Sequence, residues 1–321
     1  MLFNRMKRIA ALCASAIAAA SVVLFPMKTE AISSYMPFPI ALQQNEESGA
    51  EIQRNSYLPE LDNWCDYPWN RGTEKNNTVG KAACSLFSVI NNVYYHTGKI
   101  IAPTVLAQYA LDKGYRRVGY DGVVLDFFPA FVQNFGSEYG MGYHGWTTSA
   151  ENALAHVRNG GSTSSNIYGH WITIVDYDAE SDLYLILDSA QACARCENIT
   201  WTDRENGIAW LSSSELLQKA KSGNYGLSGV VNMLFSFDYT FTAQMGDANG
   251  SGEIDMSDAT IILSQYAYDI AGLESFPYHP HPSQNELCAM AADVDGDSCI
   301  SIDDATIVLQ MYADRMAGID Y

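Results

Sequence analysis

Three residues far apart in the sequence carry the side chains of a nucleophile, a proton carrier and an orienting acid. Cys84 precedes an amphipathic stretch, His170 opens a run of alternating residues, and Asp188 closes the next such run. A cysteine thiolate can attack a carbonyl carbon, an imidazole can carry the proton, and a carboxylate can fix the imidazole tautomer. These residue types indicate hydrolysis through a cysteine nucleophile.

The cysteine is predicted to lie at the N-terminal end of a helix. In the stretch TVGKAACSLFSVINNVYYHTGK, apolar residues recur at helical spacing after Cys84, namely Leu86, Val89, Ile90, Val93 and Tyr94. The positive end of the helix dipole lowers the pKa of a thiol placed there and favours the thiolate. A small buried cysteine in an ordinary core helix is an equally good interpretation of this segment taken alone.

The histidine and the acid are predicted to flank one β-hairpin. In GHWITIVDYDAESDLYLILDSA, residues 171–177 and 183–187 alternate around the polar turn DAESD. His170 and Asp188 then lie opposite each other, and we expect Asp188 to accept a hydrogen bond from the ring. Either residue alone could be a core histidine or a strand-end acid, but their placement with Cys84 favours a catalytic set.

A second group of residues has the spacing of calcium ligands. The loops DANGSGEIDMSD (247–258) and DVDGDSCISIDD (293–304) place side-chain oxygens at positions 1, 3, 5, 9 and 12. Calcium takes about six to eight oxygens, and position 7 can add a backbone carbonyl. The predicted ligands are Asp247, Asn249, Ser251, Glu253 (carbonyl), Asp255 and Asp258, and then Asp293, Asp295, Asp297, Cys299 (carbonyl), Ser301 and Asp304.

Each loop leads into almost the same phrase, DATIILSQYA at 258–267 and DATIVLQMYA at 304–313. In both phrases apolar and aromatic residues recur four apart, which predicts a helix after each loop. Two acidic turns before ordinary helices would be the simpler interpretation of one copy. Two copies that agree at every ligand position predict two loop–helix units and two Ca²⁺ ions.

Composition and charge restrict the classes of protein. The chain has 321 residues, of which 48% are hydrophobic, so about two globular domains are expected. Residues 246–321 hold 14 acidic residues against Arg315 as the one base, within a net charge of -19. Such a segment disfavours nucleic acid and anionic membranes as partners and favours cations.

The first 31 residues are predicted to be an export signal. A basic start at Arg5, Lys7 and Arg8 precedes the apolar stretch 9–25, and TEA before Ile32 has the form of a cleavage site. An uncleaved anchor is the alternative, but this stretch is short for a span of about 20 residues. We therefore expect a secreted, extracellular protein without a membrane partner.

Export would permit disulfides among the six cysteines that follow the signal. Cys193 and Cys196 form a C-x-x-C, which could be a local disulfide, half of a zinc site or a redox pair. Zinc is disfavoured because no second C-x-x-C or H-x-x-H accompanies it. A structural pair is the preferred interpretation.

The duplicated loops resemble a type I dockerin module over about residues 246–321, because Asp rather than Glu closes both EF-hand-like loops. The resemblance implies a small all-α, calcium-binding domain. Its partner would be a cohesin domain on the scaffolding protein of a cellulosome, a polysaccharide-degrading assembly at the bacterial cell surface. Ser298 replaces the usual Gly at position 6, and Cys288, in the long segment between repeats, could bridge to Cys299. Positions 10 and 11, which often choose the cohesin, differ between the copies, so symmetric two-way binding is not expected.

The segment 55–240 resembles the C39-like branch of the papain-like cysteine peptidases. The stretches ELDNWCDYPW, TVGKAAC and GHWITIVDY carry this resemblance. It implies an α+β fold in which the cysteine helix packs against an antiparallel sheet that bears His170 and Asp188. The family uses a Gln side chain in its oxyanion hole, and Glu60 stands at that position by our alignment. Asn63, Asn76 or Asn77 could replace it.

Together with the export signal (1–31), these resemblances predict a linker (32–54), a peptidase domain (55–240) and a dockerin (246–321). The expected function is that of a thiol protease, a hydrolase of peptide bonds that is anchored to a cellulosome by cohesin. The alternative is a catalytically inactive papain-like domain that serves as a binding or structural component. A carbohydrate-cleaving enzyme is disfavoured because no convincing carboxylate pair is present.

Overall fold

The computed structural model describes residues 39–56, 58, 61, 63–69, 77–116, 122–191, 198–229, 234–239, 244–273 and 285–319. The predicted signal, Glu60, Asn76 and the pair Cys193 and Cys196 lie outside these residues, so the predictions for them are unchanged. Among the helices in the described ranges, none has both the length and the apolar character required to cross a bilayer.

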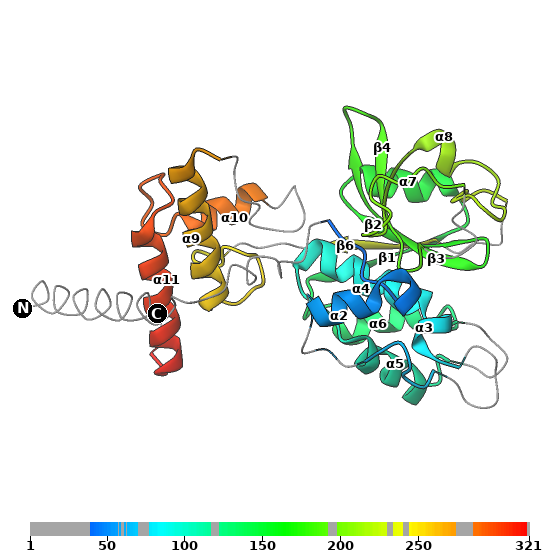
Figure 1. Cartoon of the computed structure of the whole chain (residues 1–321), viewed down its shortest axis with the longest axis horizontal. Helices are drawn as coiled ribbons and strands as arrows, with labels where there is room; N and C mark the ends of the chain where they lie inside the picture. The colour runs from blue at the N-terminus through cyan, green and yellow to red at the C-terminus, as the bar shows by residue number, and fades with distance from the viewer. Residues whose placement is uncertain are drawn as a thin grey trace, which may run out of the picture. The chain divides into compact units, whose positions relative to one another are not determined.

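The described chain is a mixture of helices and one six-stranded antiparallel sheet (Figure 1). The strand order is β1-β6-β2-β3-β4-β5, and every pairing within it is antiparallel. The strands are β1 (Met141–Thr147), β2 (Ser162–Ile167), β3 (His170–Asp178), β4 (Leu183–Leu187), β5 (Ile208–Ser212) and β6 (Leu234–Tyr239). The expectation of helices packed with an antiparallel sheet is confirmed at this level.

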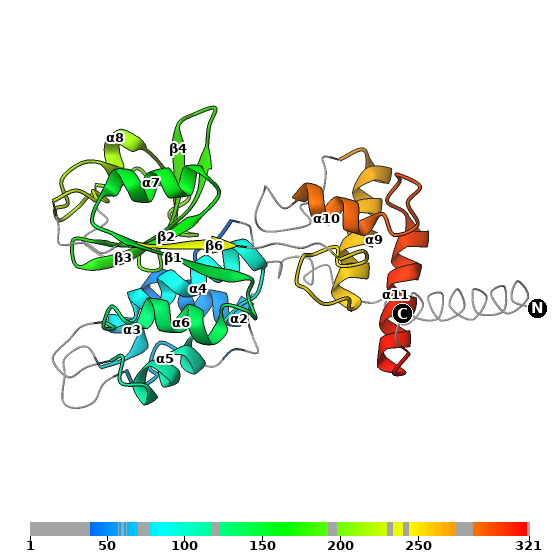
Figure 2. The same ribbon diagram turned by 180° about the vertical axis from the view of Figure 1, so that it is seen from behind.

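Helices cover both faces of the sheet, as Figures 1 and 2 show. Helix α4 contacts β2 and β3, and α6 contacts β1, whereas α7 packs on the opposite face. The helical segments before the C-terminal module are η2 (Glu46–Ser48), α2 (Ala50–Ser56), α3 (Val79–Ala82), α4 (Cys84–Thr97), α5 (Pro103–Asp112), α6 (Phe127–Phe135), α7 (Ala150–Arg158) and α8 (Ser213–Leu216).

Alternation along the strands divides the core into two apolar layers, because successive side chains point to opposite faces of a sheet. Ile174 and Ile186 pack in the cluster that contains Leu154 of α7. Val175 and Leu187 pack in the cluster that contains Tyr95 of α4. The sheet therefore holds α4 and α7 on its two faces.

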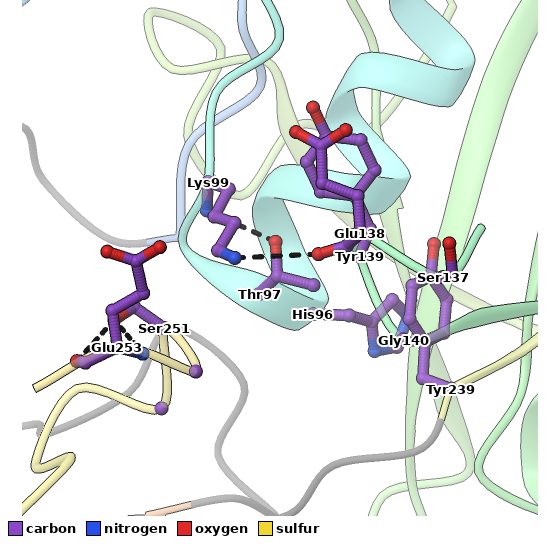
Figure 3. A pocket seen from close by; sticks show the side chains of 12 residues that line it. His96, Thr97, Lys99, Ser137, Glu138, Tyr139, Gly140, Tyr239, Ser251 and Glu253 are labelled. Atoms are coloured by element: carbon purple, nitrogen blue, oxygen red, sulfur yellow. Dashed lines mark hydrogen bonds between the residues drawn. The ribbon is translucent and has the colours of Figure 1, made fainter. Parts of the chain in front are cut away.

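Helix α4 is the most buried helix of the fold, since every residue from Cys84 to His96 is buried. It ends at Gly98, whose φ of 69° is the left-handed conformation that glycine adopts without steric cost. Near this end His96 stacks on Tyr239 of β6, with ring centroids 3.9 Å apart (Figure 3). These contacts fix the axis of the helix whose first residue is Cys84.

The predicted hairpin is confirmed as β3 and β4. Its register pairs Thr173 with Leu187, after an irregularity between Ile174 and Asp176. His170 and Asp188 are therefore not directly opposite, as the sequence suggested, but diagonal to each other. Diagonal neighbours on one face are still within reach of long side chains.

The N-terminal part of the described chain belongs to the packed fold. Ile40, Ala41 and Leu42 are buried, and the Leu42 amide donates to Asn91 Oδ1 of α4 at 2.6 Å. The Ala41 amide donates to the carbonyl of Asn206 at 2.8 Å. Residues 40–54 therefore do not form the linker expected over 32–54, because they are tied to the core by buried hydrogen bonds.

The C-terminal helices α9 (Met256–Ala271), α10 (Asn285–Ala292) and α11 (Ile302–Met316) have a core of their own. Ile262 of α9, Ala292 of α10 and Val308 of α11 are fully buried in this cluster. The helices after the two loops are as predicted. Helix α10 was not predicted; its short apolar stretch NELCAMAA lies in the long segment between the repeats.

The cysteines of this module do not form the bridge suggested by the sequence. Cys288 is free and fully buried in α10, where it contributes to the apolar cluster. Cys299 is also free and is exposed in the second loop. Burial raises the pKa of Cys288 to about 12, so it is an inert core thiol.

Candidate functional site

The fold brings Cys84, His170 and Asp188 together from three elements. Cys84 is the first residue of α4, His170 is the first residue of β3, and Asp188 directly follows β4. Nε2 of His170 lies 2.7 Å from Asp188 Oδ1. The hydrogen bond expected between the ring and the acid is therefore present.

The third partner of this set is the thiol. A hydrogen bond and a charge interaction join the His170 ring to Cys84. Because Nε2 is engaged by Asp188, the other ring nitrogen, Nδ1, is the one left to face the sulfur. The imidazole thus lies between a thiol at a helix start and a carboxylate, which is the order required for nucleophilic catalysis.

Burial and hydrogen bonds hold the orienting acid. Asp188 is fully buried, and its Oδ1 also accepts the Ala190 amide at 2.7 Å. Its Oδ2 accepts a hydrogen bond from the Tyr225 hydroxyl. Tyr225 is 2% exposed. Sequence reasoning missed it because it follows β5 and α8 without a motif.

The electrostatics of the His170–Asp188 pair favour the charged imidazolium and the charged carboxylate. Burial opposes charge on His170, but the Asp188 carboxylate and the hydrogen bonds to Asp188 and Cys84 raise its pKa well above the ordinary value. Burial opposes charge on Asp188 too, yet His170, Tyr225 and Ala190 lower the pKa of that carboxyl. The stability from the pair is lost as pH rises through the folded-state pKa of His170. It is also lost as pH falls through the folded-state pKa of Asp188.

Buried polar contacts fix the nucleophile helix against the sheet that carries the histidine. Thr173 Oγ1 of β3 donates to the Ser88 carbonyl of α4 at 3.0 Å. Asn92 Nδ2 of α4 lies 3.1 Å from Ser164 Oγ of β2. Buried hydrogen bonds that can form in a single geometry favour one packing arrangement. These two bonds therefore position Cys84 relative to His170.

A glutamine, Gln44, links the segment before Cys84 to the segment after Asp188; it was not among the residues predicted from the sequence. The Gln44 side chain donates to the Gly80 carbonyl at 3.1 Å, one turn before Cys84. Its Oε1 accepts from the Ser189 hydroxyl at 3.2 Å, beside Asp188. Gln44 is buried.

The asparagines considered as oxyanion donors are differently placed. Asn63 and Asn77 are both exposed. The Asn63 side chain accepts a hydrogen bond from Arg54 at 2.8 Å. The structure therefore offers Gln44, and not these asparagines, as a buried amide close to the start of α4.

The first predicted calcium loop folds around two fully buried carboxylates, Asp247 and Asp258. Asp247 accepts hydrogen bonds from the amides of Ser251 and Gly252 at 2.9 and 2.8 Å. Asp258 accepts from the amides at positions 3 and 9 of the loop, at 3.1 and 2.8 Å. The Ser251 hydroxyl lies 3.1 Å from the Glu253 carbonyl oxygen, so positions 5 and 7 are adjacent.

The second loop repeats this arrangement. Asp304, also fully buried, accepts from the amides of Val294 and Ser301 at 2.8 Å each. Asp293 accepts from the amide of Ser298 at 3.0 Å. Ser298 has a φ of 68°, the left-handed conformation expected at position 6, and a side chain there costs some stability relative to glycine.

Helix capping accounts for some of these carboxylates. Asp255 and Ser301 are N-caps, and Asp258 and Asp304 complete a capping box at the starts of α9 and α11. Capping explains positions 9 and 12 of each loop. It leaves unexplained the carboxylates at position 1 of both loops, Asp247 and Asp293, and those at positions 3 and 5 of the second loop, Asp295 and Asp297.

The remaining carboxylates fit a hard cation. Ligand atoms of Asp293, Asp295 and Asp297 all lie within 4.8 Å of one another. Asp293 Oδ1 is buried without a hydrogen bond. In the first loop, burial and the nearby carboxylates of Asp247 and Asp255 raise the pKa of Asp258 to about 6. A divalent cation in the first loop would offset this repulsion between carboxylates. A cation in the second loop would coordinate Asp293 Oδ1, which otherwise has no hydrogen-bond partner.

The chain has no match among known protein-family models, curated proteins or solved structures.

Proposed function

We propose that residues 39–239 act as a cysteine peptidase. The observation that carries this proposal is the contact of His170 with both Cys84 and Asp188. The helix N-terminus and the neighbouring imidazolium both favour the thiolate of Cys84. The acidic partner is held by Tyr225 and Ala190, so the ring keeps one orientation.

The reaction proceeds in two covalent steps. The Cys84 sulfur forms a bond to the substrate carbonyl carbon, and His170 gives its Nδ1 proton to the amine as the peptide C–N bond breaks. Water then loses a proton to His170 and attacks the acyl thioester. The carboxylate is released and the thiolate and imidazolium are restored. Asp188 stays ionised throughout and fixes the ring.

Gln44 supplies a donor for the negative charge that develops on the carbonyl oxygen, together with the Cys84 amide. We expect Gln44→Ala to lower kcat by about 10²–10³-fold, the usual effect of losing one oxyanion donor. Gln53→Ala removes another buried amide, one that hydrogen-bonds to Gln43 and Ala41. If both variants fold and lose the same activity, Gln44 is only a structural residue.

Residues 244–319 are proposed to form a calcium-binding dockerin that docks to a cohesin. The duplicated hydrogen-bond pattern around Asp247 and Asp293 supports this proposal. Positions 1, 3, 5, 7, 9 and 12 of each loop would hold one Ca²⁺. The ion would supply positive charge that ties the two ends of each loop together. The chain would then be a secreted component of a cellulosome-type assembly.

Thiol alkylation discriminates the peptidase from the inactive-domain alternative. The pKa of Cys65 is raised to about 11, first by burial and then by Glu46, so its thiolate is scarce near neutral pH. We expect iodoacetamide to label Cys84 at least about 10²-fold faster than Cys65 at pH 6–7, as read by peptide mass spectrometry. Equal labelling rates for Cys84 and Cys65 would favour the inactive domain.

A further inference from the structure

A cluster of two histidines and one aspartate lies outside the proposed active site. His144 is on β1, His156 is on α7 and Asp238 is on β6, and their ligand atoms all lie within 4.8 Å of one another. Nδ1 of His144 is 3.2 Å from Asp238 Oδ2. Nε2 of His156 is 3.6 Å from Asp238 Oδ1.

The geometry points to a binding site for a divalent transition metal, with Zn²⁺ as the best-fitting ion. Imidazole and carboxylate are common ligands of Zn²⁺, at bond lengths of about 2.0–2.2 Å. Two such bonds at a tetrahedral angle place the ligand atoms about 3.3 Å apart. The separations of 3.2 and 3.6 Å are close to that spacing.

The backbone places His144 in the cluster by an irregularity of the edge strand. The register of β1 against β6 pairs Tyr143 with Phe237 and Gly145 with Ser236, which leaves His144 as the extra residue of a bulge. Gly145 has a φ of 146°, which a residue with a side chain rarely adopts. Bulges redirect a side chain relative to regular alternation, and here the redirected side chain is a metal-ligating one.

The ring of the second histidine, His156, is positioned by Gly161 and by the Phe237 carbonyl. A Cβ atom on Gly161 would lie 2.0 Å from His156 Nε2, so the absence of a side chain there makes room for the ring. In the described structure Nε2 lies 2.8 Å from the Phe237 carbonyl oxygen, to which its N–H donates. Metal binding would replace that proton with the cation, so the hydrogen bond to the Phe237 carbonyl oxygen would be lost and the ring would turn Nε2 toward the ion.

Exposure is consistent with a site that is filled from solvent. The side chains of His144 and Asp238 are each 56% exposed, whereas that of His156 is 9% exposed. Because β1 is at the edge of the sheet, the metal would join this edge strand to β6 and to α7. A link of this kind stabilises the folded edge, because the ion binds the folded state and not the unfolded chain.

The test is Zn²⁺ binding to the full secreted chain in excess Ca²⁺, which fills the acidic loops first. All proteins carry Cys84→Ala, so that the proposed nucleophile does not bind the metal. Isothermal titration gives the number of Zn²⁺ ions bound, and Co²⁺ gives a visible spectrum that reports nitrogen and oxygen ligands. Glu151→Gln, an exposed carboxylate change on the same helix as His156, is the matched control.

We expect His144→Ala and Asp238→Asn each to lose one bound equivalent of Zn²⁺ and the corresponding Co²⁺ spectrum. Glu151→Gln should keep both. Zn²⁺ should also raise the melting temperature of the parent protein but not that of His144→Ala. The same stoichiometry in the parent and in both site variants would overturn the proposal, as would no Zn²⁺ binding by the parent. The three residues would then form only the hydrogen bonds of His144 to Asp238 and of His156 to the Phe237 carbonyl.

Discussion

Replacing Cys84 with alanine should lower casein hydrolysis by the full chain by at least about 10³-fold, because Cys84 is the nucleophile proposed to form the acyl intermediate. Cys84 is the described cysteine that contacts an imidazole, through His170. The protein should otherwise be intact, since Ala is small and a good helix former at the start of α4. The measurement is the initial rate of release of soluble peptides, with matched circular dichroism spectra.

The control for this experiment is Cys65→Ala. Cys65 is also buried, but the structure gives it Arg54 rather than a histidine as a partner, and its pKa is raised to about 11. Its replacement should leave kcat within about twofold. A Cys84→Ala protein that hydrolyses casein at the parental rate would show that the peptidase activity arises from another site.

Chelation of calcium should unfold the C-terminal helices while leaving the sheet domain folded. Without a cation, the buried or clustered carboxylates of both loops repel one another. Asp293 Oδ1 is also buried without a hydrogen bond that could take the place of a bound cation. We expect EGTA to reduce the amide-exchange protection of α9 and α11 by at least about 10²-fold. Protection of α4 and β3 should be unchanged. Binding to an immobilised cohesin should be lost and should return with Ca²⁺.

A matched pair of variants separates ligation from general loss of negative charge. Asp295→Asn changes a predicted ligand at position 3 of the second loop. Asp303→Asn changes an exposed acid at position 11, which is not a predicted ligand. Asp295→Asn should lower the calcium affinity of this loop by at least about tenfold, and Asp303→Asn should change it little. Equal effects of the two changes would mean that net charge, and not ligation, holds the module together.

Local periodicity was sufficient to predict the elements that carry the nucleophile and the histidine. The helical spacing from Leu86 to Tyr94 predicted α4, and the alternation on either side of DAESD predicted β3 and β4. Both patterns arise because each element buries one repeated set of side chains. The hydrogen bond from His170 to Asp188 was predicted from the hairpin, although the register of β3 and β4 makes the pair diagonal rather than opposite.

Contacts between distant segments could not be predicted in this way. Tyr225 reaches Asp188 across 37 residues, and Gln44 reaches Ser189 across 145. Neither contact leaves a periodic signal, because it depends on how whole elements pack. The burial of residues 40–44 was missed for the same reason, and so a segment of the site was assigned to a linker.

The proposed reaction depends on a covalent bond between Cys84 and the substrate. The most direct measurement is mass spectrometry of the full chain, quenched in acid during turnover of a peptide ester. We expect an acyl group bound to the peptide that contains Cys84, and we expect it to be absent in His170→Ala. An intact Cys84 during turnover, or an acyl group on another residue, would contradict it.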